Sequence, residues 1–124
     1  MKQYHGFKDL IVYQKAFKLA MEIFYVTKTF PVEERYALTD QIRRASRSIG
    51  SCIAEAWSKR RYVKSFVAKL IDSQSESCET IHWLDVSLAS KYIEIIKHKE
   101  LSDLTLEIQR MLESMINNPE KFCK

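Results

Sequence analysis

Four stretches of this chain place apolar residues at alternating steps of four and three, the spacing that keeps side chains on one face of an α-helix. The first consists of Val12, Ala16, Leu19, Ile23, Val26 and Phe30, and the second of Leu38, Ile42, Ala45, Ile49, Cys52 and Ala56. The third is interrupted by polar Gln74 and Ser77 and consists of Val63, Val67, Leu70, Ile81, Leu84 and Leu88. The fourth consists of Leu101, Leu104, Ile108, Met111 and Met115. The pattern predicts helices over about residues 9–29, 38–58, 63–92 and 99–118.

Residues that stop or cap helices lie at the ends of these stretches. Pro31 and Pro119 end the first and fourth helices, because proline lacks an amide hydrogen and clashes with the preceding turn. Thr39 or Asp40 can cap the second helix. The remaining links, residues 58–62 and 96–100, are short, and short links between long helices favour antiparallel neighbours. We therefore predict an all-α fold: a single domain over residues 1–124, built as an antiparallel up-down-up-down four-helix bundle.

The composition supports helices and narrows the class of protein. Only two glycines and two prolines occur among 124 residues, which leaves few tight turns. No apolar run approaches the roughly 20 residues that cross a bilayer, and the first residues lack the pattern of a signal peptide. We expect a cytoplasmic protein with no membrane partner. The three cysteines are widely spaced, which argues against a disulfide framework or zinc site; we expect Cys52 and Cys78 in the core and Cys123 as a tail thiol.

The motifs of common enzymes and metal sites are absent. Glycine occurs only at positions 6 and 50, so no glycine loop that cradles a phosphate can form, and no nucleophile elbow or His-Glu-x-x-His pair is present. Glu79 and His82 have the Glu-x-x-His spacing of di-iron bundles, but such sites need two of these pairs and two further glutamates. Glu94 and His98 have the wrong step. We expect no catalysis, no cofactor and no metal.

Positive charge is concentrated in one quarter of the chain. Residues 41–71 carry eight basic residues and one acid, a net charge of +7, whereas the other residues together carry −3. Arginine and lysine at this density attract phosphates, so we predict a nucleic-acid-binding surface made of Arg43, Arg44, Arg47, Lys59, Arg60, Arg61 and Lys64. Tyr62 and Phe66 interleave with these charges and could stack on the bases of single-stranded RNA. The alternative is that the charges only solubilise a helix end and that Phe66 belongs to the core.

Two helices carry more apolar or small-residue surface than a monomeric bundle needs. Tyr13, Phe17, Ala20 and Phe24 flank the seam of the first helix, and a wide apolar surface on a small protein indicates a partner. On the second helix, the face opposite the seam is charged at its start and then small, which would let another helix approach. We predict an oligomer interface made of Tyr13, Phe17, Phe24, Gly50, Ser51 and Ala54. A merely solvated polar face is the alternative.

Two questions about ion pairs remain open in the sequence. Glu55 can pair with Lys59 on its own helix, or it can be a buried carboxylate that answers an arginine of a neighbouring helix or subunit. By periodicity, Arg43, Arg44 and Arg47 lie on the outer side of the second helix. There they meet either solvent and phosphate or the next subunit.

Several motifs resemble one known family. "FKDLIVYQKAFKLA", "TKTFPVEERYALTDQIRRAS" and "SIGSCIAEAW" resemble the bacterial four-helix-bundle family named after proteins encoded in intervening sequences of 23S ribosomal RNA genes, and "FVAKL" and "ETIHWL" resemble the third-helix motif of one branch. The family usually has asparagine at the position of Cys52, and glycine at those of Ala37 and Ala56. The resemblance implies a ring-like homopentamer with no known catalytic activity. Related proteins accompany the reverse transcriptase of diversity-generating retroelements and bind nucleic acid through a basic surface.

Two hypotheses from different classes follow. The first is a non-enzymatic, oligomeric bundle that binds RNA or DNA through the surface from Arg43 to Lys69. The second is a protein-interaction scaffold that binds a reverse transcriptase or another protein and has no nucleic-acid role, in which case its arginines form interface ion pairs. A metal-dependent oxidase would require bound iron or manganese.

Overall fold

The computed structural model describes residues 3–124, and these residues form four long helices and no strand. The helices are α1 (Ile11–Val26), α2 (Asp40–Ser58), α3 (Val63–Ala89) and α4 (Ile95–Asn117). Short 3-10 turns flank them at η1 (Phe7–Asp9), η2 (Thr27–Thr29), η3 (Val32–Glu34) and η5 (Pro119–Lys121), and a π-helical turn, η4 (Arg35–Thr39), leads into α2. The prediction of an all-α fold is confirmed.

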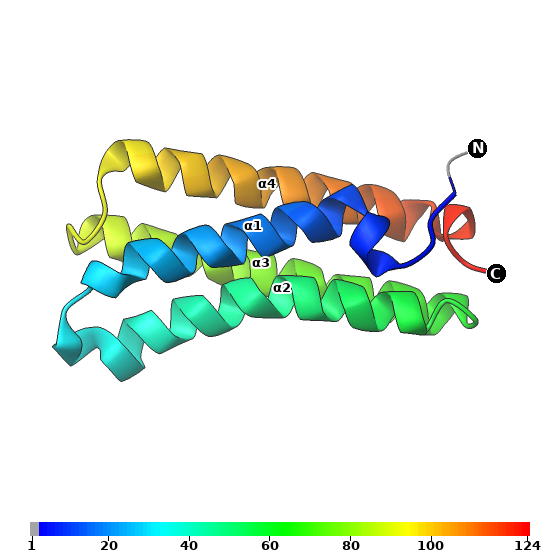
Figure 1. Cartoon of the computed structure of the whole chain (residues 1–124), viewed down its shortest axis with the longest axis horizontal. Coiled ribbons are helices and arrows are strands. Elements are labelled where there is room, and N and C mark those ends of the chain that lie inside the picture. Colours follow the sequence, from blue (N-terminus) through cyan, green and yellow to red (C-terminus); the bar gives the residue numbers. More distant parts are fainter. Residues whose placement is uncertain (1–2) are drawn as a thin grey trace.

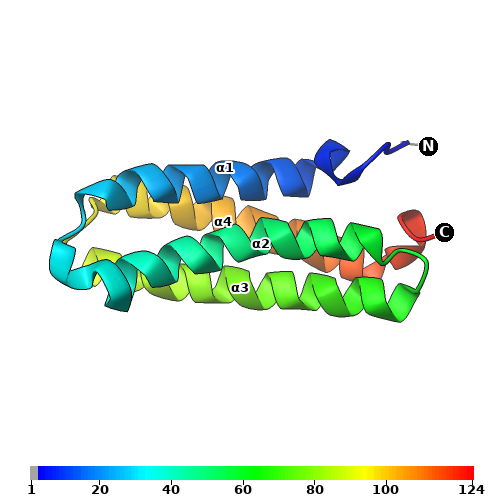
Figure 2. The ribbon, with the colours of Figure 1, turned by 60° about the horizontal axis from the view of Figure 1, so that its bottom comes forward.

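Consecutive helices run in opposite directions, as the colour gradient along the ribbon shows (Figure 1). Each helix packs against the next one in the chain, and α1 also packs against α4. The α2–α3 turn, η1 and η5 therefore lie at one end of the bundle, and the α1–α2 and α3–α4 links lie at the other (Figures 1 and 2). No helix among the described residues is long and apolar enough to cross a membrane.

All four helices contribute to the core, and the predicted seams of the first two are largely buried. Val12, Ala16, Leu19 and Ile23 of α1 are buried, and every residue predicted for the second seam is buried as well. The predicted side-chain cap of α2 is wrong, because neither Thr39 nor Asp40 makes a capping hydrogen bond and Thr39 instead lies inside the π-helical turn. Cys52 is buried as expected, whereas Cys78 is exposed and Cys123 is half-buried.

The core face of α3 differs from the predicted one. Val63 is 48% exposed, and the buried positions are Phe66, Leu70, Ser73, Ser77, Thr80, Leu84 and Ser87. The buried hydroxyls are satisfied: Ser73 donates to the carbonyl of Ile49 on α2 at 2.8 Å, and Thr80 donates to the carbonyl of Glu76 at 2.9 Å. Because a hydroxyl that finds a carbonyl can be buried at little cost, these small residues let α2 and α3 pack closely.

The predicted turn at residues 96–100 is also wrong. The α3–α4 link spans residues 90–94, and Ile95 and Ile96 are the first residues of α4, with 69% and 74% of their surface exposed. Lys91 closes α3 in the left-handed conformation, with φ of 65°. Its amide donates to the carbonyl of Leu88 and the amide of Tyr92 donates to that of Ser87, both at 2.9 Å. This is the double hydrogen bond of a Schellman helix end, at a position where glycine is usual.

Candidate nucleic-acid interface

The predicted basic residues fall into two groups in space. Arg43, Arg44 and Arg47 lie on the first half of α2, whereas Lys59, Arg60, Arg61 and Lys64 surround the α2–α3 turn. Lys59 follows Arg47 by twelve positions, which corresponds to about 18 Å along a helix. The two groups are therefore separate surfaces, and each is described by itself.

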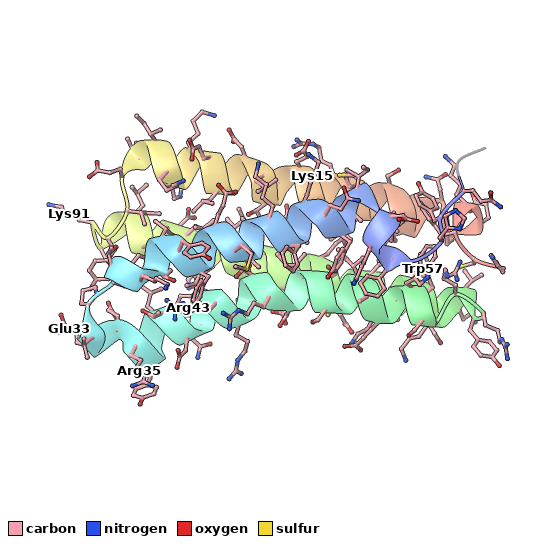
Figure 3. The ribbon with its side chains drawn as sticks, in the orientation of Figure 1. Lys15, Glu33, Arg35, Arg43, Trp57 and Lys91 are labelled. Atoms are coloured by element: carbon pink, nitrogen blue, oxygen red, sulfur yellow. The ribbon has the colours of Figure 1, made fainter. Side chains whose placement is uncertain are left out.

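Arg43 is bound to α1 instead of facing outward. Its Nε donates to Thr27 Oγ1 at 2.8 Å and its Nη2 to the Phe24 carbonyl at 3.4 Å. The guanidinium carbon lies 4.8 Å from the centre of the Phe24 ring, and Figure 3 shows Arg43 beside α1 and α2. The periodicity missed this contact because a long side chain can reach sideways to a neighbouring helix. Arg43 stabilises the bundle and has fewer donors left for phosphate.

Arg44 and Arg47 remain exposed. They line a hollow of about 460 Å³ together with Asp40, Arg43, Ser48 and Ser51. The guanidinium carbon of Arg47 lies 5.5 Å from the centre of the Phe24 ring, which also receives Lys28 Nζ at 4.9 Å. Phe24 therefore contacts cations, and Asp40 reduces the positive charge of this hollow.

At the α2–α3 turn, Arg60 is also held in place. Its guanidinium carbon lies 3.6 Å from the centre of a Trp57 ring, and its Nε donates to the Trp57 carbonyl at 3.0 Å. Its Nη1 donates to the carbonyl of Phe122 at 3.5 Å. Lys59, Arg61 and Lys64 are exposed and make no ion pair within residues 3–124. These three cations are therefore the most accessible to a ligand at this end of the bundle.

The C-terminal segment adds charge that sequence reasoning missed. The amide of Lys124 donates to the carbonyl of Arg60 at 3.4 Å, so this segment lies against the α2–α3 turn and carries exposed Lys121 and Lys124. A possible signal was the aromatic Phe122 shortly after Pro119, since an apolar residue beyond a helix stop often packs back. We call the resulting surface the basic end; it consists of Lys59, Arg60, Arg61, Lys64, Lys121 and Lys124.

Aromatic packing fixes the shape of the basic end. Tyr4 packs edge-on against Trp57 with ring centres 6.1 Å apart, and it also contacts Phe122 at 5.8 Å. Phe66 stacks on Phe122 at 6.2 Å and is only 1% exposed. The expectation that Phe66 stacks on bases is therefore wrong, because Phe66 belongs to the core. Tyr62 is 65% exposed and remains available for stacking.

Lys69 does not extend this surface. Its Nζ lies 3.0 Å from Glu55 Oε2 and 3.6 Å from Asp72 Oδ2. The hydrogen bond to Glu55 raises the pKa of Lys69, so the ammonium is held in its charged, paired form. Glu55 pairs with Lys69 of α3 and not with Lys59, so the expected pair within α2 is wrong. In the single chain the Glu55 side chain is 55% exposed.

An apolar hollow of about 330 Å³ lies between α1 and α2. Its lining includes five of the six predicted interface residues: Tyr13, Phe17, Gly50, Ser51 and Ala54. Phe17 is 57% exposed. Gly50, expected beside the outer face of the second helix, is buried against α1, and an added Cβ would lie 3.7 Å from Tyr13 Cε1. The sixth residue, Phe24, lies outside this lining.

The residues with metal-like spacing have other partners. Glu79 Oε1 accepts a hydrogen bond from Trp83 Nε1 at 3.2 Å, and the His82 ring packs edge-on against Trp83. His98 Nε2 lies 2.8 Å from Asp85 Oδ1. Within residues 3–124, no three His, Cys, Asp or Glu side chains are grouped so that they could hold a metal ion.

The fold places this chain among small all-α proteins with four helices. A family model described as 23S rRNA-intervening sequence protein matches residues 8–114, and the chain belongs to that family. The chain is also similar to the crystal structure of a protein of unknown function from the S23 ribosomal protein family of Bacteroides thetaiotaomicron. The two are 28% identical with a TM-score of 0.78, over 86% of this chain and 96% of that chain. No curated protein matches the chain.

Proposed function

We propose that this protein is a non-enzymatic, oligomeric up-down-up-down bundle that binds single-stranded RNA through its basic end. One observation carries the proposal: Lys59, Arg61 and Lys64 are exposed without a carboxylate partner, next to the exposed ring of Tyr62. Cations of this kind bind phosphates and release counterions, while an exposed aromatic ring stacks on unpaired bases.

Photo-crosslinking tests where the RNA lies. The full-length protein is irradiated with single-stranded RNA that carries 4-thiouridine, and the modified peptides are identified by mass spectrometry. We expect adducts on the peptide that contains Tyr62 and fewer on Tyr36, which is 72% exposed but lies in the η4 turn at the other end of the bundle. The comparison is internal, because both tyrosines are accessible in the same sample.

Two outcomes would contradict the proposal. Adducts concentrated on Tyr36 would place RNA at the wrong end of the molecule. The absence of any RNA adduct would instead favour the scaffold hypothesis, whose supporting observation is the apolar hollow between α1 and α2.

The same hollow supports self-association. Phe17 and Met21 line it and remain 57% and 36% exposed, and covering apolar surface of this kind releases about 25 cal/mol per Å². We propose that a second copy covers it and that the assembly is a homopentamer of 14.6 kDa chains. Light scattering on a sizing column should give five times the chain mass; a monomer at micromolar concentration would contradict this proposal.

A further inference from the structure

A small notch opens in the basic end, between the α2–α3 turn and the C-terminal segment. Its volume is about 270 Å³, and it is lined by Trp57, Ser58, Arg60, Arg61 and Lys124. Three of these side chains are cationic and none is acidic. Figure 3 shows Trp57 at this end of the bundle, far from Glu33 and Lys91 at the other end. The notch therefore concentrates positive charge around a space that the protein leaves open.

The guanidinium of Arg60 is preorganised to bind a ligand in this notch. A guanidinium has five N–H donors in a planar fork, and the carbonyls of Trp57 and Phe122 each accept one. The remaining donors are free, while the stack on Trp57 at 3.6 Å fixes the plane of the fork. Because a fixed guanidinium loses little side-chain entropy on binding, Arg60 is better suited to a specific contact than a mobile surface arginine.

The other lining groups show which ligand would fit. Arg61 and Lys124 are exposed and unpaired among the described residues. The Ser58 hydroxyl already donates to the Glu55 carbonyl at 2.6 Å, so the available donors come from the three cations. Several donors, with no acidic side chain in the lining, suit an anion with several oxygens and more than one charge. A phosphate monoester, with a charge of about −1.5 to −2 and three terminal oxygens, fits better than a carboxylate.

We propose that this notch is a phosphate-binding site that takes the terminal phosphate of a single-stranded RNA. The inference rests on the proposed function, because the exposed Tyr62 ring, next to Arg61 in the chain, would stack on the adjoining base. A free nucleotide offers the same phosphate chemistry, and the experiment separates the two sources. An internal phosphodiester carries one charge, so it gains less from the three cations.

The test compares two RNAs of one sequence, ten nucleotides long with a 3′ fluorophore, that carry either a 5′-phosphate or a 5′-hydroxyl. Fluorescence anisotropy with the full-length protein should show about fivefold tighter binding of the 5′-phosphate form, the upper range for an exposed charge contact. Arg61→Gln should reduce this ratio to about twofold, because Arg60 and Lys124 remain in the notch. Lys64→Gln is the matched control: Lys64 belongs to the basic end but does not line the notch, so this variant should weaken both RNAs and preserve the ratio.

The outcomes separate the notch from the proposed function. Equal affinity of the wild-type protein for both RNAs would overturn the proposal of a phosphate site in the notch. It would not contradict RNA binding at the basic end. An unchanged ratio in Arg61→Gln would overturn the phosphate site as well. If neither RNA binds, the proposed function fails, and calorimetry with adenosine monophosphate then tests the notch by itself. Binding that Arg61→Gln weakens supports a phosphate site that takes a free nucleotide. No binding, or binding that Arg61→Gln leaves unchanged, overturns the phosphate site.

Discussion

Replacing Phe66 by alanine should lower the free energy of unfolding by about 3–5 kcal/mol, the usual cost of emptying a buried aromatic site. Phe66 is 1% exposed and stacks on Phe122, so its removal leaves a cavity and also loosens the C-terminal segment. This is a large part of the roughly 5–15 kcal/mol that stabilises a typical domain. Urea denaturation followed by circular dichroism measures the change.

Tyr62→Ala is the matched control for this prediction. Tyr62 lies four residues before Phe66 but is 65% exposed, so its removal should change stability by no more than about 0.5 kcal/mol. Similar losses in the two variants would contradict the assignment of Phe66 to the core and Tyr62 to the surface. A stable Phe66→Ala protein would return Phe66 to the candidate stacking residues.

The first two helices could be predicted from the sequence because their predicted seams are apolar and largely buried. From Leu38 in η4 to Ala56 in α2, the residues of the buried seam recur every three or four positions, and hydrophobic periodicity detects this pattern directly. The buried face of α3 could not be predicted from hydrophobic periodicity. Its core includes Ser73, Ser77 and Thr80, and a hydroxyl that is satisfied by a nearby carbonyl looks polar in the sequence although it is buried.

The turn between α3 and α4 was missed for a related reason. Glycine or proline normally marks such a turn, yet here Lys91 adopts the left-handed conformation without either. Ile95 and Ile96 gave no help, since they are apolar but exposed at the start of α4. The backbone hydrogen bonds that close α3 depend on geometry that residue type alone does not reveal.

The candidate site was predicted in outline but not in its details. The excess charge of residues 41–71 pointed to the α2–α3 turn, and the exposed cations Lys59, Arg61 and Lys64 lie there. The contacts of Arg43 with Thr27 and of Arg60 with Trp57 required the fold. So did the approach of Lys121 and Lys124, because the Arg60–Phe122 contact joins residues 62 positions apart.

Converting Lys59, Arg61 and Lys64 together to glutamine should weaken binding to mixed-sequence single-stranded RNA by about 100-fold at 0.1 M salt. Each phosphate neutralised on a single strand contributes about 0.7 to the slope of log affinity against log salt concentration, so three lost contacts reduce the slope by about 2. Stability should change by less than about 0.5 kcal/mol, because the three side chains are exposed and make no ion pair among the described residues.

A charge-matched variant separates local binding from net charge. Converting Lys18, Lys91 and Lys99 to glutamine removes the same three charges from exposed positions outside the basic end. If net charge alone attracted RNA, both triple variants would lose affinity equally. If the basic end is the binding surface, the charge-matched variant should stay within about threefold of the wild-type affinity.

The salt dependence of RNA affinity, measured side by side for the wild-type protein and these two triple variants, tests RNA binding at the basic end most directly. We predict a steep slope for the wild-type protein and the charge-matched variant, and a slope lower by about 2 for the variant of Lys59, Arg61 and Lys64. The same slope in all three proteins, or no RNA binding by the wild-type protein, would contradict RNA binding at the basic end.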